Sequence, residues 1–189
     1  MTTVAEVRKT LESKDIKDHF EHIFRIQTGF ADLCFSGNGI GDRKGETLNC
    51  QKIGDSAKTG KHGYNDLLVP WTWEMVRAME DEIREIKILL PWKHWSKAQL
   101  GEKEHPKLSP EERLNLLRIE LVDILHFLVE ALAFTGLDAE STYQLYLRKC
   151  QNNVTRQEKL YNDSNKTDAD DKAVAASFSE TKAAQGSLF

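Results

Sequence analysis

The 189-residue chain contains few cysteines and no long apolar run. Its three cysteines are an odd, widely spaced set, which argues against a disulfide framework or a zinc site and suits a reducing compartment. No apolar stretch approaches the roughly 20 residues that span a bilayer. The first residues, MTTVAEVRKTLESKD, lack the apolar segment of a secretory signal. We therefore expect a cytoplasmic protein with no membrane partner.

The chain also lacks an excess of positive charge. It carries 30 acidic and 26 basic side chains, a net charge of −4. Nucleic-acid binding through bulk charge needs a basic face, so we expect no nucleic-acid partner. Hydrophobic residues make up 40% of the chain and charged residues 30%, which is enough apolar material for a core beneath a highly charged surface.

Prolines are scarce, and no segment shows the apolar alternation of a β-strand. Apolar residues at helical spacing instead predict an all-α helical bundle. Its helices are expected over residues 1–13, 16–35, 71–90, 110–135 and 139–161. We expect one domain over 1–161, interrupted at 36–66 by a long loop that holds seven of the eleven glycines. The polar residues 162–189 are expected to form a disordered tail.

Local signals mark both ends of the helix over 110–135. Ser109 is the expected N-cap, Pro110 occupies the first turn, and Glu112 completes a capping box. Gly136 predicts the end of this helix.

The helix over 16–35 carries an amide on its apolar face. By helical spacing, Gln27 lies among the apolar residues Phe20, Ile23, Ala31 and Cys34. An amide in that position is unusual unless it faces a ligand.

Two helices each present a pair of acids, three residues apart, in the middle of an apolar face. Glu82 has apolar residues three, four and seven positions away, and Glu85 follows one turn later. Glu120 and Asp123 repeat this arrangement in the next long helix. Burying a lone carboxylate costs several kcal/mol or keeps it protonated, so two such pairs need compensation.

Two kinds of compensation remain open. The acids can form buried ion pairs with arginines such as Arg77, Arg84 or Arg118. Alternatively, the four carboxylates together hold a divalent cation, which takes oxygen ligands. We favour the cation because few basic residues share these faces. Mg²⁺ is the expected ion, with Mn²⁺ as an alternative, because Mg²⁺ keeps positions for water and substrate phosphates.

Several motifs resemble those of the all-α nucleoside triphosphate pyrophosphatases, the MazG-like and dimeric dUTPase superfamily. The resemblance covers roughly residues 16–161 and is closest to the branch of dimeric dUTPases and phage dCTP/dUTP pyrophosphatases. The matching segments are Asp81-Glu82-x-x-Glu85, Pro91-Trp-Lys-His-Trp95, Leu108-Ser-Pro-Glu-Glu112, Glu120-x-x-Asp123-x-x-His126-Phe127 and Tyr146-x-x-Lys149-Cys150-x-x-Asn153-x-x-Arg156-Gln157. Two positions depart from the pattern, because Cys150 replaces the usual asparagine and Leu160 the usual glycine.

The resemblance implies an enzyme of nucleotide-pool control that hydrolyses a deoxynucleoside triphosphate to the monophosphate and pyrophosphate. The first expectation is dUTP, and dCTP or another dNTP is the alternative. A non-catalytic helical interaction module is the alternative from a different class of function. The implied fold is a bundle of the MazG-like or dimeric dUTPase type in a homodimer, placed in the host cytoplasm if the protein is phage-encoded.

The resemblance also implies roles for individual residues. The implied catalytic and metal-holding residues are Glu82, Glu85, Glu120 and Asp123, with Glu82 positioning or deprotonating the attacking water. The implied substrate-binding residues are Gln27, Lys93, Trp95, Lys149, Asn153 and Arg156. Of these, Gln27 and Trp95 would read the base.

Overall fold

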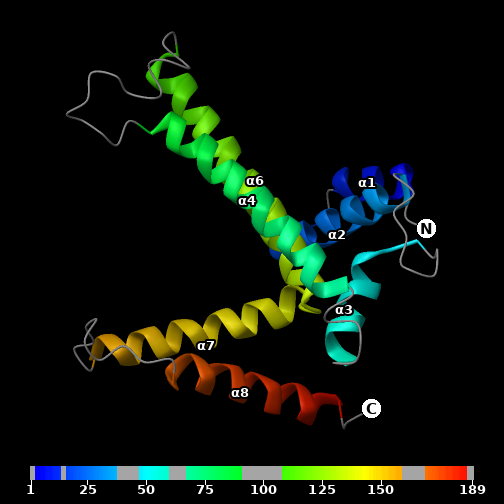
Figure 1. Ribbon diagram of the computed structural model, residues 1–189, viewed down its shortest axis with the longest axis vertical. Coiled ribbons are helices and arrows are strands. Elements are labelled where there is room, and N and C mark those ends of the chain that lie inside the picture. Colours follow the sequence, from blue (N-terminus) through cyan, green and yellow to red (C-terminus); the bar gives the residue numbers. More distant parts are fainter. Residues whose placement is uncertain are drawn as a thin grey trace. The chain divides into compact units, whose positions relative to one another are not determined.

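The computed structural model describes residues 3–13, 16–37, 47–59, 67–90, 108–158 and 169–186. These residues form α-helices and no β-strand, which confirms the predicted all-α class (Figure 1). The helices are α1 (Val4–Leu11), α2 (His19–Gly37), α3 (Cys50–Thr59), α4 (Val69–Leu89), α6 (Pro110–Phe134), α7 (Ala139–Glu158) and α8 (Ala169–Gly186). In the described part of the chain, no helix combines the length and apolarity needed to cross a membrane.

Contacts divide the chain into two compact units, unit 1 (Met1–Asp138) and unit 2 (Ala139–Phe189). Unit 1 is built around α4 and α6, which lie side by side along their length (Figure 1). The two helices are antiparallel, because Leu89 near the end of α4 and Leu116 near the start of α6 line one pocket. The family-specific type of bundle stays a prediction.

The sequence signals at the two ends of α6 act as predicted. The Ser109 hydroxyl accepts the backbone N–H of Glu112 at 3.2 Å, and the Glu112 carboxylate accepts the backbone N–H of Ser109 at 2.8 Å. At the other end, Gly136 adopts a φ of 78°, which favours glycine. The N–H of Gly136 then donates to Ala133 and the N–H of Leu137 to Leu132, a Schellman motif that ends the helix.

The core of unit 1 joins α2, α3, the start of α4 and the end of α6. Phe134 and Ile53 are fully buried there, and Phe35 packs edge-on against Trp71 with ring centroids 4.9 Å apart. The inward face of α2 differs from the predicted one. Its buried residues are Phe24, Gln27, Ala31 and Phe35, rather than Phe20, Ile23, Ala31 and Cys34. Helical spacing alone permits either set of residues to face inward. The packing of α2 against α3 and α6 determines which set is buried.

The prediction of a loop over residues 36–66 is wrong for residues 50–59, which form α3. Gly54 is the one glycine in this stretch, so the glycine-rich composition belongs to its flanks. Asn49 caps the helix by accepting the backbone N–H of Lys52 at 2.7 Å, and Ile53 with Ala57 one turn later contacts the core. Residues 38–46 and 60–66 lie outside the described residues.

Unit 2 contains α7 and α8, which pack against each other. The expected disordered tail over 162–189 is therefore corrected for residues 169–186, where α8 is rich in alanine, a strong helix former. Arg148 on α7 donates to the Ser177 hydroxyl at 3.1 Å, and its guanidinium lies 5.9 Å from the ring centre of Phe178. These contacts hold α8 against α7. The pattern of apolar residues in the sequence did not predict them.

Gly54 permits a close approach between α3 and the end of α6. A Cβ atom at this position would lie 2.9 Å from the carbonyl oxygen of Ala133 and 3.1 Å from the Cα of Gly136. We expect Gly54→Ala to lower the free energy of unfolding by about 1–3 kcal/mol, because backbone atoms must move apart. Urea unfolding followed by circular dichroism measures this change.

Gly37→Ala is the matched control, because a Cβ atom there meets nothing within 4 Å. Its free energy of unfolding should stay level or rise slightly. Equal stability of the two variants would contradict the close approach of α3 and α6.

Candidate functional site

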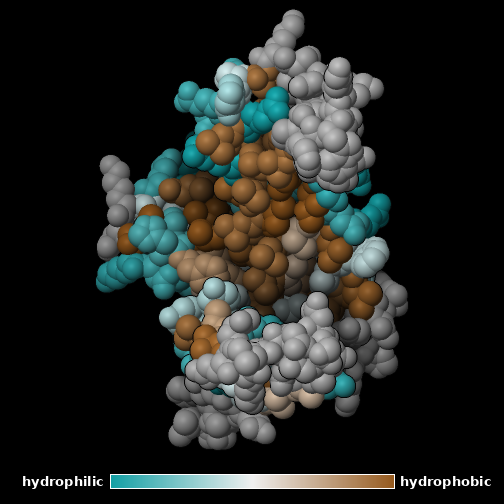
Figure 2. Space-filling view, turned by 90° about the vertical axis from the view of Figure 1, so that its left-hand side faces the viewer, coloured by the Kyte–Doolittle hydropathy of each residue, from teal (hydrophilic) through white to brown (hydrophobic). Residues whose placement is uncertain are grey.

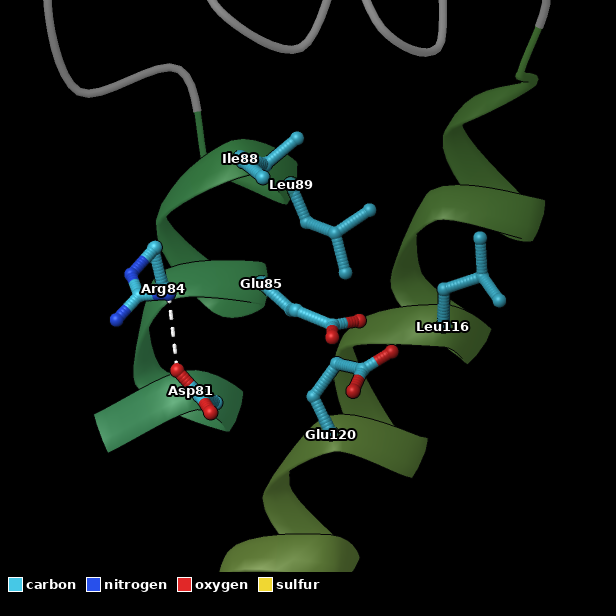
Figure 3. Close-up of a pocket in the computed structure, with 7 residues that line it drawn as sticks. All are labelled: Asp81, Arg84, Glu85, Ile88, Leu89, Leu116 and Glu120. Carbon is cyan, nitrogen blue, oxygen red and sulfur yellow. Dashed lines mark ion pairs between the residues drawn. The ribbon is translucent and has the colours of Figure 1, made fainter. Parts of the chain in front are cut away.

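The antiparallel packing of α4 and α6 brings predicted acids from both helices together. Carboxylate oxygens of Glu82, Glu120 and Asp123 all lie within 4.8 Å of one another. Glu85 lines a pocket together with Glu120, and Figure 3 shows their carboxylate groups pointing toward each other. We call these four residues the acidic cluster.

The acidic cluster is less buried than the sequence pattern suggested. Glu82, Glu120 and Asp123 are half-buried, and Glu85 is exposed. Two packed helices cover one stripe of each other and leave the rest of each surface open, so the apolar neighbours of the acids are only partly covered. The acids thus remain within reach of a ligand.

Electrostatic repulsion within the cluster acts on Glu82. Partial burial raises the pKa of Glu82, and a hydrogen bond with Glu120 raises it further. The negative charges of Glu85, Asp123 and Glu120 act in the same direction. The cluster therefore favours either a shared proton or a bound cation over free carboxylates.

The arginines considered as partners for the cluster bond to other residues on their own helices. The pairs are Arg77 with Glu74 at 3.5 Å, Arg84 with Asp81 at 2.9 Å (Figure 3), and Arg118 with Asn115 at 3.0 Å. His126 does approach the cluster, with its Nδ1 3.3 Å from an oxygen of Asp123. Among the described residues, arginine ion pairs do not provide the compensation that the sequence left open.

An open pocket of about 620 Å³ adjoins the cluster (Figure 3). Glu85 and Glu120 line it together with the ion pair of Asp81 and Arg84, whereas Ile88, Leu89 and Leu116 make its apolar side. Its volume falls within the range of small-molecule sites. A ligand there would meet carboxylate oxygens on one side and aliphatic carbon on the other.

The remaining predicted substrate residues are distributed over other parts of the chain. Lys93 and Trp95 lie outside the described residues. Lys149, Asn153 and Arg156 are residues of α7 in unit 2. Asn153 is exposed, and the Lys149 ammonium forms an ion pair with Asp171 of α8.

Gln27 is buried, and it bonds to a residue that sequence reasoning missed. The side-chain nitrogen of Gln27 donates to a carboxylate oxygen of Glu130 on α6. Glu130 lies seven residues after Asp123, hence on the same face of the helix, and between the aromatic residues Phe127 and Phe134. The position of this glutamate on an apolar helix face is the feature of the sequence that could have identified it.

Comparison with known proteins connects this chain to phage nucleotide enzymes. It is 32% identical over 108 residues to a dCTP pyrophosphatase of Enterobacteria phage T4, a match covering 50% of this chain and 63% of that protein. It is 35% identical over 72 residues to a dCTP pyrophosphatase of Enterobacteria phage LZ5, covering 37% of this chain and 41% of the relative.

A third match is a DNA replication protein of Enterobacteria phage T4. This protein is 31% identical over 96 residues, which cover 43% of this chain and 24% of the relative. The chain thus spans less than two thirds of each relative. No protein-family model and no solved structure matches the chain.

Neutralising Glu82 should stabilise the metal-free protein at neutral pH. A carboxyl group with a raised pKa binds its proton more readily in the folded state, so stability falls as pH rises through that pKa. We expect Glu82→Gln to have a higher Tm than the wild type at pH 7 in the presence of a chelator. The difference should disappear below the ordinary pKa of 4.5, where Glu82 is protonated in both states.

Glu80→Gln is the control, because Glu80 is an exposed glutamate of α4 outside the acidic cluster. Its Tm should follow that of the wild type at every pH. A Glu82→Gln variant less stable than the wild type at pH 7 would show that the cluster is not under repulsion.

Proposed function

We propose that the protein hydrolyses a deoxynucleoside triphosphate to the monophosphate and pyrophosphate, with dCTP as the preferred substrate. The observation that carries this proposal is the convergence of Glu82, Glu120 and Asp123 from two helices. Sequence motifs placed dUTP first, but two relatives bear the name dCTP pyrophosphatase and favour the cytosine nucleotide. dUTP remains the second substrate to test.

The donor set of the acidic cluster fits Mg²⁺ or Mn²⁺. Hard divalent cations take carboxylate oxygens. Besides partial burial, repulsion from Glu85, Asp123 and Glu120 raises the pKa of Glu82, and a bound cation would relieve that repulsion. We propose Glu82, Glu85, Glu120 and Asp123 as its ligands. When bound, the metal supplies charge neutralisation for the triphosphate and acidifies a water molecule.

Glu82 is the proposed group that positions the attacking water and accepts its proton. A carboxylate beside a bound cation can hold the attacking water by a hydrogen bond and accept its proton. In the metal-free cluster, partial burial and the neighbours Glu120, Glu85 and Asp123 raise the pKa of Glu82, and a bound cation would oppose this rise. The role of Glu82 as the base is therefore proposed from its position in the cluster and not from its pKa.

The proposed substrate contacts come from several parts of the chain. Lys149 and Arg156 would contact phosphates and Asn153 the sugar or a phosphate. Gln27 and Trp95 would contact the base, and Lys93 completes the proposed set. Because Asp171 pairs with Lys149, a phosphate group would replace a carboxylate at this lysine.

We also propose that the protein is a homodimer. Large apolar side chains are exposed along α4 and α6, namely Val69, Trp73, Ile83, Leu114, Ile119, Leu121, Val122 and Leu128. Leu114, Leu121 and Leu128 recur every seven residues, so they form one stripe along α6. Figure 2 shows a face of the molecule on which apolar side chains gather, and such patches mark interaction surfaces. We place the dimer in the host cytoplasm, where the nucleotide substrate is found.

A panel of dNTPs tests the proposed activity. With Mg²⁺ or Mn²⁺ we expect release of pyrophosphate, fastest from dCTP, and no turnover after chelation. Glu120→Gln should abolish turnover while leaving the fold intact, because it removes one charged ligand of the cluster. Glu80→Gln should retain wild-type turnover.

The opposite results would identify the second class of function. A wild-type protein that turns over no nucleotide and shows no cation binding by calorimetry would be a helical interaction module, in which the acids bind basic residues of a partner. Turnover that survives Glu120→Gln would instead refute the assignment of ligands.

Light scattering tests the proposed homodimer. We expect twice the mass of the 21.6 kDa chain at micromolar concentration. Leu121→Glu should shift the protein toward a monomer, because it places a charge in the middle of the exposed leucine stripe of α6. Leu11→Glu, at an exposed leucine of α1, should leave the mass unchanged. A wild-type monomer would exclude the dimer.

A further inference from the structure

Gln27 and Glu130 form a polar pair in the core of unit 1. Their exposed fractions are 6% and 8%, and they are the buried polar residues among those that the structure describes. The Gln27 side-chain nitrogen donates to Glu130 across the contact between α2 and α6. The two most buried polar side chains of the described core are therefore bonded to each other.

Stability alone does not account for a carboxylate at this position. The residues beside Glu130 on α6, Val129 and Ala131, are buried and apolar, and an apolar pair can join two helices without the cost of burying a charge. Burial raises the pKa of Glu130, and the hydrogen bond from Gln27 opposes that rise. The amide therefore offsets part of the cost of a charged carboxylate at this position, although burial has the larger effect on the pKa.

A carboxylate at this position determines which way the Gln27 amide faces. An ionised carboxylate only accepts hydrogen bonds, whereas a glutamine amide has a donor end and an acceptor end. A free amide can rotate by a half-turn and exchange these ends. Because Glu130 requires the NH₂ group, the positions of the remaining amide N–H and of the amide oxygen are fixed.

The two orientations of an amide match different pyrimidine bases. Cytosine presents an acceptor at N3 beside a donor amino group, and uracil presents a donor at N3 beside an acceptor oxygen. An amide that rotates freely can match both bases by exchanging its ends. An amide held in one orientation matches one base and opposes the other.

The spacing along α6 places this pair in register with the acidic cluster. Glu130 follows Asp123 by seven residues, which is two helical turns or about 10 Å along the axis on the same face. For Gln27 to contact the base, a nucleotide with its phosphates at the acidic cluster would extend along α6 toward Glu130. The helix that carries Glu120 and Asp123 therefore also carries the residue that orients Gln27.

We infer that Glu130 is a positioning residue that sets the preference between cytosine and uracil nucleotides by fixing the orientation of the Gln27 amide. This inference rests on the proposed dNTP hydrolysis and on base contact by Gln27. Glu130 itself need not touch the base. Its effect is on the choice between substrates rather than on the chemical step.

The test compares kcat/KM for dCTP and dUTP in three variants. Glu130→Gln keeps the volume but allows both amides to rotate, so the dCTP to dUTP ratio should move toward one by roughly tenfold. The exchange variant Gln27→Glu with Glu130→Gln restores an amide-to-carboxylate hydrogen bond in reverse. It should recover the Tm of the wild type but not its ratio. Glu111→Gln, an exposed glutamate at the start of α6, should keep the wild-type ratio.

The outcomes separate this inference from the proposed function. If the dCTP to dUTP ratio of kcat/KM in Glu130→Gln stays within twofold of the wild-type ratio, the inference is overturned. It is also overturned if the exchange variant recovers both the wild-type Tm and the wild-type ratio, because the pair would then only join α2 to α6. If Glu130→Gln does not fold, the exchange variant decides by the same criterion. A wild-type protein inactive on every dNTP refutes the proposed function and the inference together, whereas an active wild type with an unmoved ratio refutes the inference alone.

Discussion

Repulsion between carboxylates on α4 and α6 is the constraint on which the candidate site depends. The antiparallel helices bring Glu82 opposite Glu120 and Asp123, with oxygens within 4.8 Å, although like charges oppose this approach. The packing of α4 against α6 holds the acids in this arrangement. Arg77, Arg84 and Arg118 bond to other residues of these helices and so do not neutralise the cluster.

The helix α6 links the parts of unit 1 that matter for the proposed chemistry. Its middle supplies Glu120 and Asp123, the next two turns supply Glu130, and its last turn supplies Phe134 to the core. A capping box and a Schellman motif fix both of its ends. Because one straight element carries all these groups, their relative positions follow from helical geometry.

Features that have a local physical cause could be predicted from the sequence. The capping box at Ser109 and the left-handed glycine at Gly136 depend on bonds within a few residues, and the structure confirms both. Elements that depend on partners distant in the sequence could not be predicted in this way. The α3 helix depends on contacts of Ile53 with the core, and α8 depends on contacts such as Arg148 with Phe178. Composition alone cannot register such contacts.

The sequence by itself determined the all-α class, the limits of α6 and the presence of acids at face-sharing positions, because each follows from helical periodicity and local hydrogen bonding. Only the tertiary structure decided that Glu82, Glu120 and Asp123 meet, that Glu85 stays exposed, and that Gln27 is bonded to Glu130. Periodicity shows which residues share a face of one helix. Which faces of different helices meet is determined by packing between distant segments, and that packing brought a glutamate overlooked in the sequence into contact with the predicted base-binding amide.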